Sequence, residues 1–301
     1  GVAPRGQPLL VLLAVTAPAL HLATSVSADP LNFSLPALFF AWCLRLRLDD
    51  STNLSRRGCL GLGLMLMALS LLKPIYLLLG AMALLVPARH FGGPRRRRQF
   101  LIVTMGAGLA LTLAWNAAYP FMPGRYWGTG ADPKTALLGI VHDPVASLTY
   151  FVHSLTQQLP IMWLDGWGRM GGYPPPFMTH ASTALSWAGL AAMLAIAAAD
   201  GHQPRDLRAS AFMAALAALF TSLIFLAFWL TFTPPNAAVI QGVQGRYFLL
   251  AFLLIGWALV YAAPFGNALR QHRTPLLILG LGLQAASLLQ GIEKFRFYWA
   301  H

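Results

Sequence analysis

Four short segments of the sequence carry polar residues that could bind or transfer a charged group. Asp29 lies in SADPLN, Lys73 begins KPIY, Asp165 lies in WLDGWG, and Arg246 lies in QGVQGRYF. A guanidinium presents a planar fork to phosphate oxygens and an ammonium presents a point charge, so Arg246 and Lys73 are the candidate anion-binding residues. The neighbouring polar side chains that we assign to the same site are Tyr76, Gln241, Gln244 and Tyr247.

Asp29 and Asp165 could supply the base that a group transfer needs in addition to an anion-binding cation. A carboxylate can deprotonate an acceptor while cations stabilise a departing phosphate, and Asp29 and then Asp165 are the candidate bases. Each residue also has a simpler interpretation. Asp29 precedes proline and could cap a helix, Asp165 lies among turn residues, and Lys73 and Arg246 could extend to lipid headgroups.

The sequence contains no pattern that identifies a metal or cofactor site. Cys43 and Cys59 match no metal-ligand spacing, and the sequence has no H-x-x-x-H, Gly-rich phosphate loop or G-x-S-x-G elbow. We therefore assign no cofactor and no metal ligand, and a requirement for a divalent metal stays open.

The composition is that of an integral membrane protein. Hydrophobic residues make up 57% and charged residues 10% of the 301 positions, and the mean hydropathy is +0.61. The lipid bilayer is therefore a partner. The excess of 21 Lys and Arg over 9 Asp and Glu reports orientation in the membrane, and it does not indicate nucleic-acid binding.

The elements that position the polar segments are apolar stretches typical of an all-α, polytopic membrane protein with a single transmembrane domain over residues 1–301. About 20 apolar residues cross a bilayer as a helix. Nine stretches are candidates, two of them too short to cross straight: 9–26, 31–46, 60–72, 75–87, 99–120, 178–199, 209–232, 247–264 and 275–292.

The distribution of basic residues predicts how these stretches thread the membrane. With the start of the chain inside, about two thirds of the 21 basic residues fall in cytoplasmic loops. Both flanks of residues 60–87 are then cytoplasmic, so this stretch forms a hairpin of two short helices that turns at Lys73-Pro74. The four polar segments reach the outer side, where residues 122–177 form a long loop with an interfacial helix near 144–163.

At SADPLN, KPIYLLL, WLDGWG and VQGRYFLL, in this order, the sequence resembles a bacterial family of predicted membrane proteins, domain of unknown function twenty-one forty-two. That family is similar to GT-C glycosyltransferases, which transfer sugars from polyprenyl-phosphate donors at the outer face of the membrane. The resemblance implies a GT-C-like fold, a polyprenyl-phosphate lipid, a saccharide acceptor and a role in surface polysaccharide or glycolipid assembly in the bacterial cytoplasmic membrane. Lys73 and Arg246 would hold the lipid phosphate.

One part of the expected pattern is missing from this sequence. GT-C proteins carry their main catalytic acid in the first outer loop, and no such loop precedes the stretch that leads to Asp29. We therefore expect a carboxy-terminal portion of a longer protein. The alternatives are a transporter or flippase of a lipid-linked saccharide, and a non-catalytic membrane subunit of a polysaccharide complex.

Overall fold

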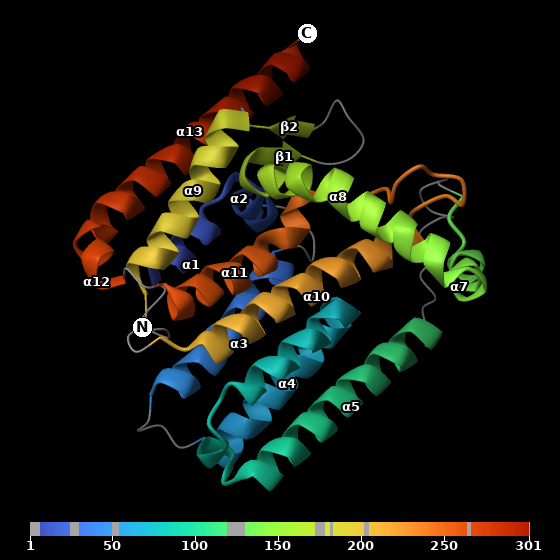
Figure 1. Ribbon diagram of the computed structural model, residues 1–301, viewed down its shortest axis with the longest axis vertical. Helices are drawn as coiled ribbons and strands as arrows, with labels where there is room; N and C mark the ends of the chain where they lie inside the picture. The colour runs from blue at the N-terminus through green and yellow to red at the C-terminus, as the bar shows by residue number, and fades with distance from the viewer. Residues whose placement is uncertain are drawn as a thin grey trace. The chain divides into compact units, whose positions relative to one another are not determined.

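The computed structural model is built from helices, with one small hairpin of strands (Figure 1). It describes residues 7–24, 30–49, 54–118, 130–171, 178–180, 183–201, 205–263 and 266–300. The chain divides into two units: the first comprises residues 1–7 and 22–120, and the second comprises residues 8–21 and 121–301.

The described helices of the first unit follow one another closely along the chain. They are α3 (Leu31–Leu48), α4 (Arg56–Leu72), the 3₁₀ helix η1 (Pro74–Leu84), the short 3₁₀ helix η2 (Ala88–Phe91) and α5 (Pro94–Ala118). Ser55 caps α4 by accepting a hydrogen bond of 3.1 Å from the Gly58 amide. Pro74 begins η1 at the first helical position, where its missing amide hydrogen costs nothing.

The predicted short-helix hairpin is confirmed as two helices that pack on each other and meet at Lys73. Lys73 is extended (φ −152°, ψ 128°), which ends α4 after 17 residues, and η1 adds 11 residues. At their usual rises these helices are about 25 Å and 22 Å long, shorter than a 30 Å hydrocarbon core. The second helix is of the 3₁₀ type, which the apolar sequence did not indicate.

Two arginines fix the end of this hairpin that lies opposite Lys73. Arg47 donates to the Leu85 carbonyl (2.7 Å), and Arg97 donates to the carbonyls of Leu84 (3.1 Å) and Val86 (3.0 Å). Leu84 is the last residue of η1, and Leu85 and Val86 follow it, so these carbonyls lie where the helix itself offers no further amide. The basic residues before and after the hairpin therefore meet at one end of the first unit, as the positive flanks predict.

Small residues allow α4 and α5 to approach closely. Thr112 donates to the Ser70 carbonyl (3.1 Å), and the Ser70 hydroxyl donates to the Gly108 carbonyl (3.2 Å). A Cβ on Gly108 would lie 3.3 Å from the Ser70 oxygen, and a Cβ on Gly63 would lie 2.9 Å from the Thr104 methyl. Interfaces of this kind, with small residues and interhelical hydrogen bonds, are typical of membrane helices.

The second unit contains the remaining described helices and the only described strands. The helices are α1 (Gln7–Ala14), the start of α2 (Ala17–Thr24), α7 (Pro133–His142), α8 (Pro144–Gly168), α9 (Thr183–Ala199), α10 (Leu207–Thr231), η3 (Gly245–Phe248), α11 (Leu249–Ala262), α12 (Gly266–Leu269), η4 (Arg270–His272) and α13 (Arg273–Ala300). Strands β1 (Arg169–Gly171) and β2 (Met178–His180) pair antiparallel directly after α8.

Helices α10 and α11 form the centre of the second unit and lie side by side (Figure 1). The Asp206 amide donates to the Tyr261 carbonyl (3.1 Å) at one end, which places the start of α10 beside the end of α11. Helices α9 and α13 also pack on each other, and Arg273 pairs with the buried Asp200 at 3.3 Å. Arg246, in η3, therefore lies at the end of the α10–α11 pair opposite Asp206.

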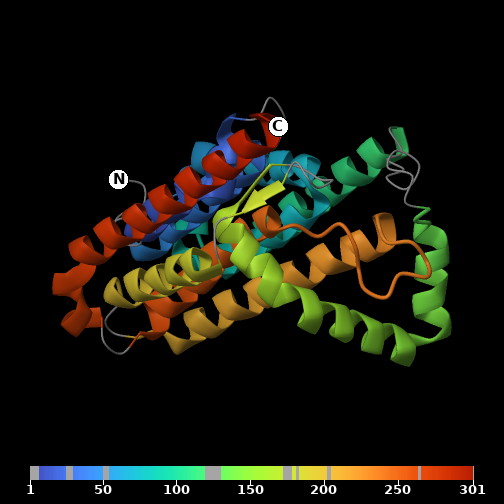
Figure 2. The ribbon, with the colours of Figure 1, turned by 90° about the horizontal axis from the view of Figure 1, so that it is seen from above.

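Helices α7 and α8 meet at a bend of 117°, which Figure 2 shows as a sharp corner. Asp132 caps α7 through the Lys134 amide (3.1 Å), and Asp143 caps α8 through the Ala146 amide (2.9 Å). The carboxylates therefore start two separate helices. The bend divides the predicted outer loop into a short arm and a long helix that extends past residue 163.

All nine predicted stretches contain helix, but they do not all have the length of a span. Among the described residues, four helices are long and apolar enough to cross a membrane, or five if the bent α7–α8 pair is one span. The first predicted stretch is broken into α1 and α2, and the stretch from 178 begins as strand β2 before α9 starts at Thr183. The protein is thus a multi-pass helical membrane protein. The described residues form fewer full-length spans than the nine apolar stretches predicted.

Candidate anion-binding site

The structure brings together two of the four polar segments. The segments WLDGWG and QGVQGRYF both lie in the second unit, where η3 packs against α8. Lys73 and Tyr76 lie in the first unit. Asp29 lies outside the described residues.

Backbone contact between two glycines joins the two segments. A Cβ on Gly245 would lie 2.3 Å from the Gly166 nitrogen and 2.7 Å from the Met162 carbonyl oxygen, so no side chain fits at this position. A Cβ on Gly166 would in turn lie 2.6 Å from the Phe252 ring. The residue before Arg246 is therefore fixed against the last turns of α8, next to Asp165.

Polar residues of α8 hold the loop that leads to Gly245. The buried Ser154 hydroxyl accepts a hydrogen bond from the Ile240 amide (3.1 Å), and the Gln158 side chain donates to the Ile240 carbonyl. At Gln241, the amide donates to the Thr233 hydroxyl (3.0 Å). The amide of Gln158, within the segment predicted as an interfacial helix, thus satisfies a buried backbone carbonyl.

The two glycines of QGVQGRYF serve the packing of this segment. Gly242 has a positive φ of 84°, a conformation that glycine adopts without strain, and a Cβ there would lie 2.3 Å from the Phe232 ring. One glycine thus accommodates an aromatic ring and the other accommodates the backbone of α8. Together they determine where Arg246 emerges.

Arg246 is a partly buried cation with an aromatic neighbour. Its Cζ lies 5.4 Å from the centroid of the Tyr247 ring, a distance typical of a cation–π contact. The Arg246 Nε is buried and has no hydrogen-bond partner among the residues that the structure describes. No described carboxylate forms an ion pair with this guanidinium. A cation in this state favours an anionic ligand, because burial without a counter-charge is costly.

The other predicted residues of this segment surround Arg246 in different ways. Gln241 is exposed, and the extended Gln244 accepts a hydrogen bond at its carbonyl from the Tyr247 amide (3.1 Å). The Tyr247 ring packs on Phe228 at a centroid distance of 5.2 Å. The side chains of Gln241 and Gln244 therefore stand close in sequence to the guanidinium without fixing it.

Lys73 and Tyr76 form a local structure of their own in the first unit. The Lys73 carbonyl accepts from the Tyr76 amide (2.9 Å), and the Tyr76 hydroxyl donates to the Asn32 carbonyl (2.7 Å). Tyr76 is buried, and Lys73 is half-buried at the turn of the hairpin. The approach of Lys73 to Arg246 stays a prediction.

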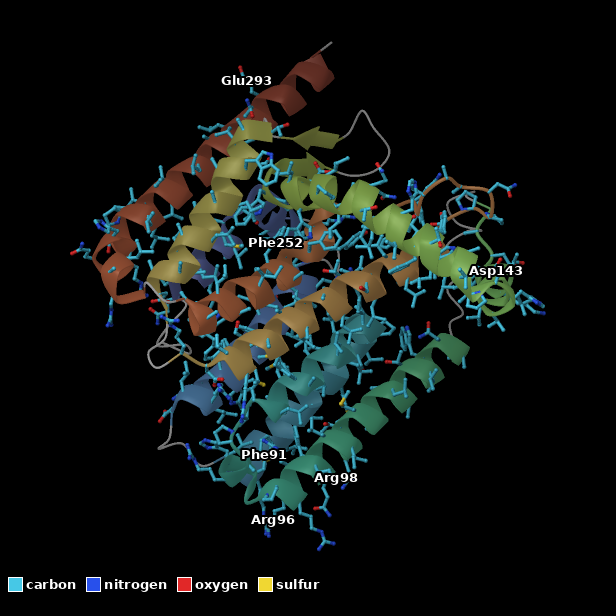
Figure 3. All side chains as sticks on the ribbon, in the orientation of Figure 1. Phe91, Arg96, Arg98, Asp143, Phe252 and Glu293 are labelled. Atoms are coloured by element: carbon cyan, nitrogen blue, oxygen red, sulfur yellow. The ribbon has the colours of Figure 1, made fainter. Side chains whose placement is uncertain are left out.

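Asp165 and its neighbouring tryptophans are more buried than the sequence suggested. Asp165 is 8% exposed and Trp167 is fully buried, although both belong to the predicted outer loop. Trp163 and Trp167 instead contact Phe252 of α11, labelled in Figure 3, at centroid distances of 5.7 and 5.5 Å. Among the described residues, no three His, Cys, Asp or Glu side chains group to hold a metal ion.

The residues that hold the loop were missed by reasoning from the sequence. Ser154 and Gln158 are four positions apart, so they share one face of a helix, and this spacing was the available signal. Reasoning from the sequence also missed Gln284, which does not hold the loop. Its position in the middle of an apolar stretch was the signal, since a polar side chain there requires a partner.

A family model described as a predicted membrane protein (DUF2142) matches residues 2–255. The chain belongs to this family. The matched range contains all four polar segments, together with the Gly245–Gly166 contact that joins two of them. No curated protein and no solved structure matches the chain. Family membership thus shows that the chain is a membrane protein. Its activity has to be inferred from the chemistry of the site.

Proposed function

We propose that this protein binds a polyprenyl-phosphate-linked sugar through the phosphate and serves its transfer, as a GT-C-like glycosyltransferase at the outer face of the bacterial cytoplasmic membrane. The product is a surface polysaccharide or glycolipid. The lipid phosphate is the ligand of Arg246, and a saccharide is the acceptor.

The observation that carries this proposal is the state of Arg246. Its guanidinium is partly buried, its Nε has no partner in the described part of the chain, and its one described contact of note is the Tyr247 ring. A phosphate monoester or diester supplies oxygens in the plane of the guanidinium fork, and it removes the cost of the unmatched charge.

The chemistry assigns distinct roles to the residues of the site. Arg246 stabilises the negative charge that develops on the phosphate as the glycosidic bond to it breaks. Asp165 is the base candidate that lies within the described residues, and it adjoins the Gly166–Gly245 contact. The family resemblance adds Asp29 as a second base candidate, and Lys73 and Tyr76 as further phosphate-binding residues. We assign Gln241, Gln244 and Tyr247, which are close to Arg246 in the sequence, to the same phosphate-binding site.

Binding of undecaprenyl phosphate to the detergent-solubilised protein tests the proposal. We expect Arg246→Ala to weaken binding by at least about tenfold, the equivalent of one charge-assisted hydrogen bond. Arg246→Lys should also weaken binding, since it keeps the charge and loses the bidentate fork. Arg270→Ala is the matched control, because Arg270 is exposed and follows the opposite end of α11. Unchanged binding by both Arg246 variants would refute the proposal.

A further inference from the structure

A second group of polar atoms lies in the second unit, buried where α8, α9 and α13 meet. Gln284 of α13 is 2% exposed, and neither its Nε2 nor its Oε1 has a hydrogen-bond partner among the described residues. The Nε1 of the fully buried Trp167 likewise has none. Natural proteins satisfy nearly all buried polar atoms, so these unsatisfied atoms on two neighbouring side chains require an explanation.

Gly189 of α9 is the residue that brings these two side chains together. A Cβ on Gly189 would lie 3.2 Å from the Gln284 Nε2 and 3.4 Å from the Trp167 ring. The buried Ser186 lies one turn earlier on α9, and the buried Ser287 lies one turn later on α13. The group is therefore a neutral polar region inside an apolar helix bundle.

The hydrogen-bonding capacity of this group is specific. The amide of Gln284 offers two donors and an acceptor with two lone pairs, and the Trp167 indole adds one donor. No described Asp, Glu, Lys or Arg contacts Gln284 or Trp167 through an ion pair or hydrogen bond. A ligand matched to such a site is uncharged and carries groups that both donate and accept, which describes the hydroxyls of a sugar.

The group is also next to the anion site along α8. Gly166 contacts Gly245, the neighbour of Arg246, and the following residue, Trp167, contacts Phe252 and faces Gly189. Two consecutive residues of α8 thus contact the neighbour of Arg246 and the glycine that faces Gln284. A lipid-linked sugar carries its phosphate on the anomeric carbon and its hydroxyls on the other carbons of the sugar, so two neighbouring sites suit two parts of one ligand.

We infer that Gln284 and Trp167 form the saccharide subsite that recognises hydroxyls of the sugar carried by the lipid phosphate at Arg246. This inference rests on the proposed function, because Arg246 must hold the phosphate. It assigns Gln284, Trp167 and the small residue Gly189 a role in selecting a glycosylated lipid over the bare lipid phosphate.

The test compares affinities of the full chain for undecaprenyl phosphate and for undecaprenyl-phosphate-linked glucose, mannose, galactose and arabinose. We expect at least one glycosylated lipid to bind about tenfold or more tightly than the bare lipid, as hydrogen bonds to otherwise unsatisfied buried groups provide. Gln284→Met keeps the volume and removes the amide, so it should reduce this preference to below about twofold with unchanged affinity for the bare lipid.

Two further variants keep the outcome interpretable. Trp167→Phe removes the indole donor and retains an aromatic ring, and it should lower the same preference if Gln284→Met fails to fold. Gln290→Met, six positions further along α13, is the matched control and should leave the preference unchanged.

Each contrary result overturns the inference. No preference for any of the four sugars, or a preference that survives both Gln284→Met and Trp167→Phe, excludes the subsite. A Gln284→Met protein that is more stable with the preference intact indicates a buried water at the amide. Failure of undecaprenyl phosphate itself to bind would refute the proposed function instead.

Discussion

The position of Arg246 is determined by the residue before it. Gly245 contacts the backbone of α8 so closely that the guanidinium can emerge only from a fixed point beside the last turns of that helix. Backbone-to-backbone contact leaves no flexible side-chain end that could move aside for an added methyl group. Gly245 thus acts on the anion site by positioning Arg246.

We predict that Gly245→Ala destabilises the protein by about 1–3 kcal/mol, the usual cost of inserting a group into a filled interior. The added Cβ would lie 2.3 Å from the Gly166 nitrogen, so η3 and α8 must separate. Undecaprenyl phosphate binding should weaken together with stability, because Arg246 shifts with η3. The measurements are unfolding in detergent and lipid binding.

Gly282→Ala on α13 is the control, because a Cβ on Gly282 meets no atom within 4 Å. Its lipid affinity should equal that of the wild type, and its free energy of unfolding should be equal or higher by up to about 1 kcal/mol, because alanine has a higher helix propensity than glycine. Equal behaviour of the two alanine variants would show that η3 does not depend on the contact with α8.

At the scale of elements, the first unit depends on how α5 packs against α4 and η1. One face of α5 carries Thr104, Gly108 and Thr112 at four-residue intervals and is buried. The opposite face exposes Ile102, Val103, Leu109 and Leu113. In a membrane protein such a helix has one face against protein and one against lipid. Its basic N-terminal turn carries Arg96 and Arg98, which project outward in Figure 3.

We predict that Gly108→Val separates α5 from the hairpin and destabilises the first unit by about 1–3 kcal/mol. A Cβ at this position would lie 3.1 Å from Leu77 and 3.3 Å from the Ser70 hydroxyl, so the larger valine cannot fit without movement. Hydrogen exchange at the end of α4 should rise, because the Ser70 and Thr112 hydrogen bonds are lost.

Gly106→Val, two positions earlier in α5, is a matched substitution with the same helix propensity. A Cβ on Gly106 meets no atom within 4 Å, so this variant should retain the stability of the wild type. A loss of stability of similar size in both variants would attribute the effect to valine in the helix and not to packing.

At the scale of the whole molecule, the predicted anion site draws residues from both units. Lys73 lies at the turn of the hairpin in the first unit, and Arg246 lies at one end of the α10–α11 pair in the second. Two cations that lie near each other at the edge of a bilayer require an anion between them. The prediction that Lys73 and Arg246 share one site therefore requires a common anionic ligand such as the lipid phosphate.

We predict that positions 73 and 244 lie within about 10 Å of each other, the range over which charges interact at 0.1 M salt. Lys73→Cys with Gln244→Cys, in a protein carrying Cys43→Ala and Cys59→Ser, should be joined by a bismaleimide of that span. Undecaprenyl phosphate should increase the yield. A pair of Lys73→Cys with Arg270→Cys is the control, and its cross-linking in place of the 73–244 pair would contradict the shared site.

The sequence by itself determined the class of the protein and the helical nature of its apolar stretches. Hydropathy predicts helices because a bilayer leaves backbone groups no other partner, and the nine apolar stretches all contain helix. Lys73-Pro74 predicts the hairpin turn because an extended residue and a proline end a helix locally, which needs no distant contact. The types of Arg246 and Lys73 likewise suffice to predict an anion ligand.

Only the tertiary structure decided which of these features meet. The contact of Gly245 with Gly166 and the hold of Ser154 on Ile240 join residues about 80 positions apart, and hydrophobic periodicity along one helix carries no information on such pairs. The same reason explains why the sequence did not predict that Trp167, in the predicted outer loop, lies fully buried on Phe252. Whether a polar residue in an apolar helix faces lipid, backbone or ligand depends on the neighbour that packs against it. For Gln158 that neighbour is Ile240, and for Gln284 it is Gly189.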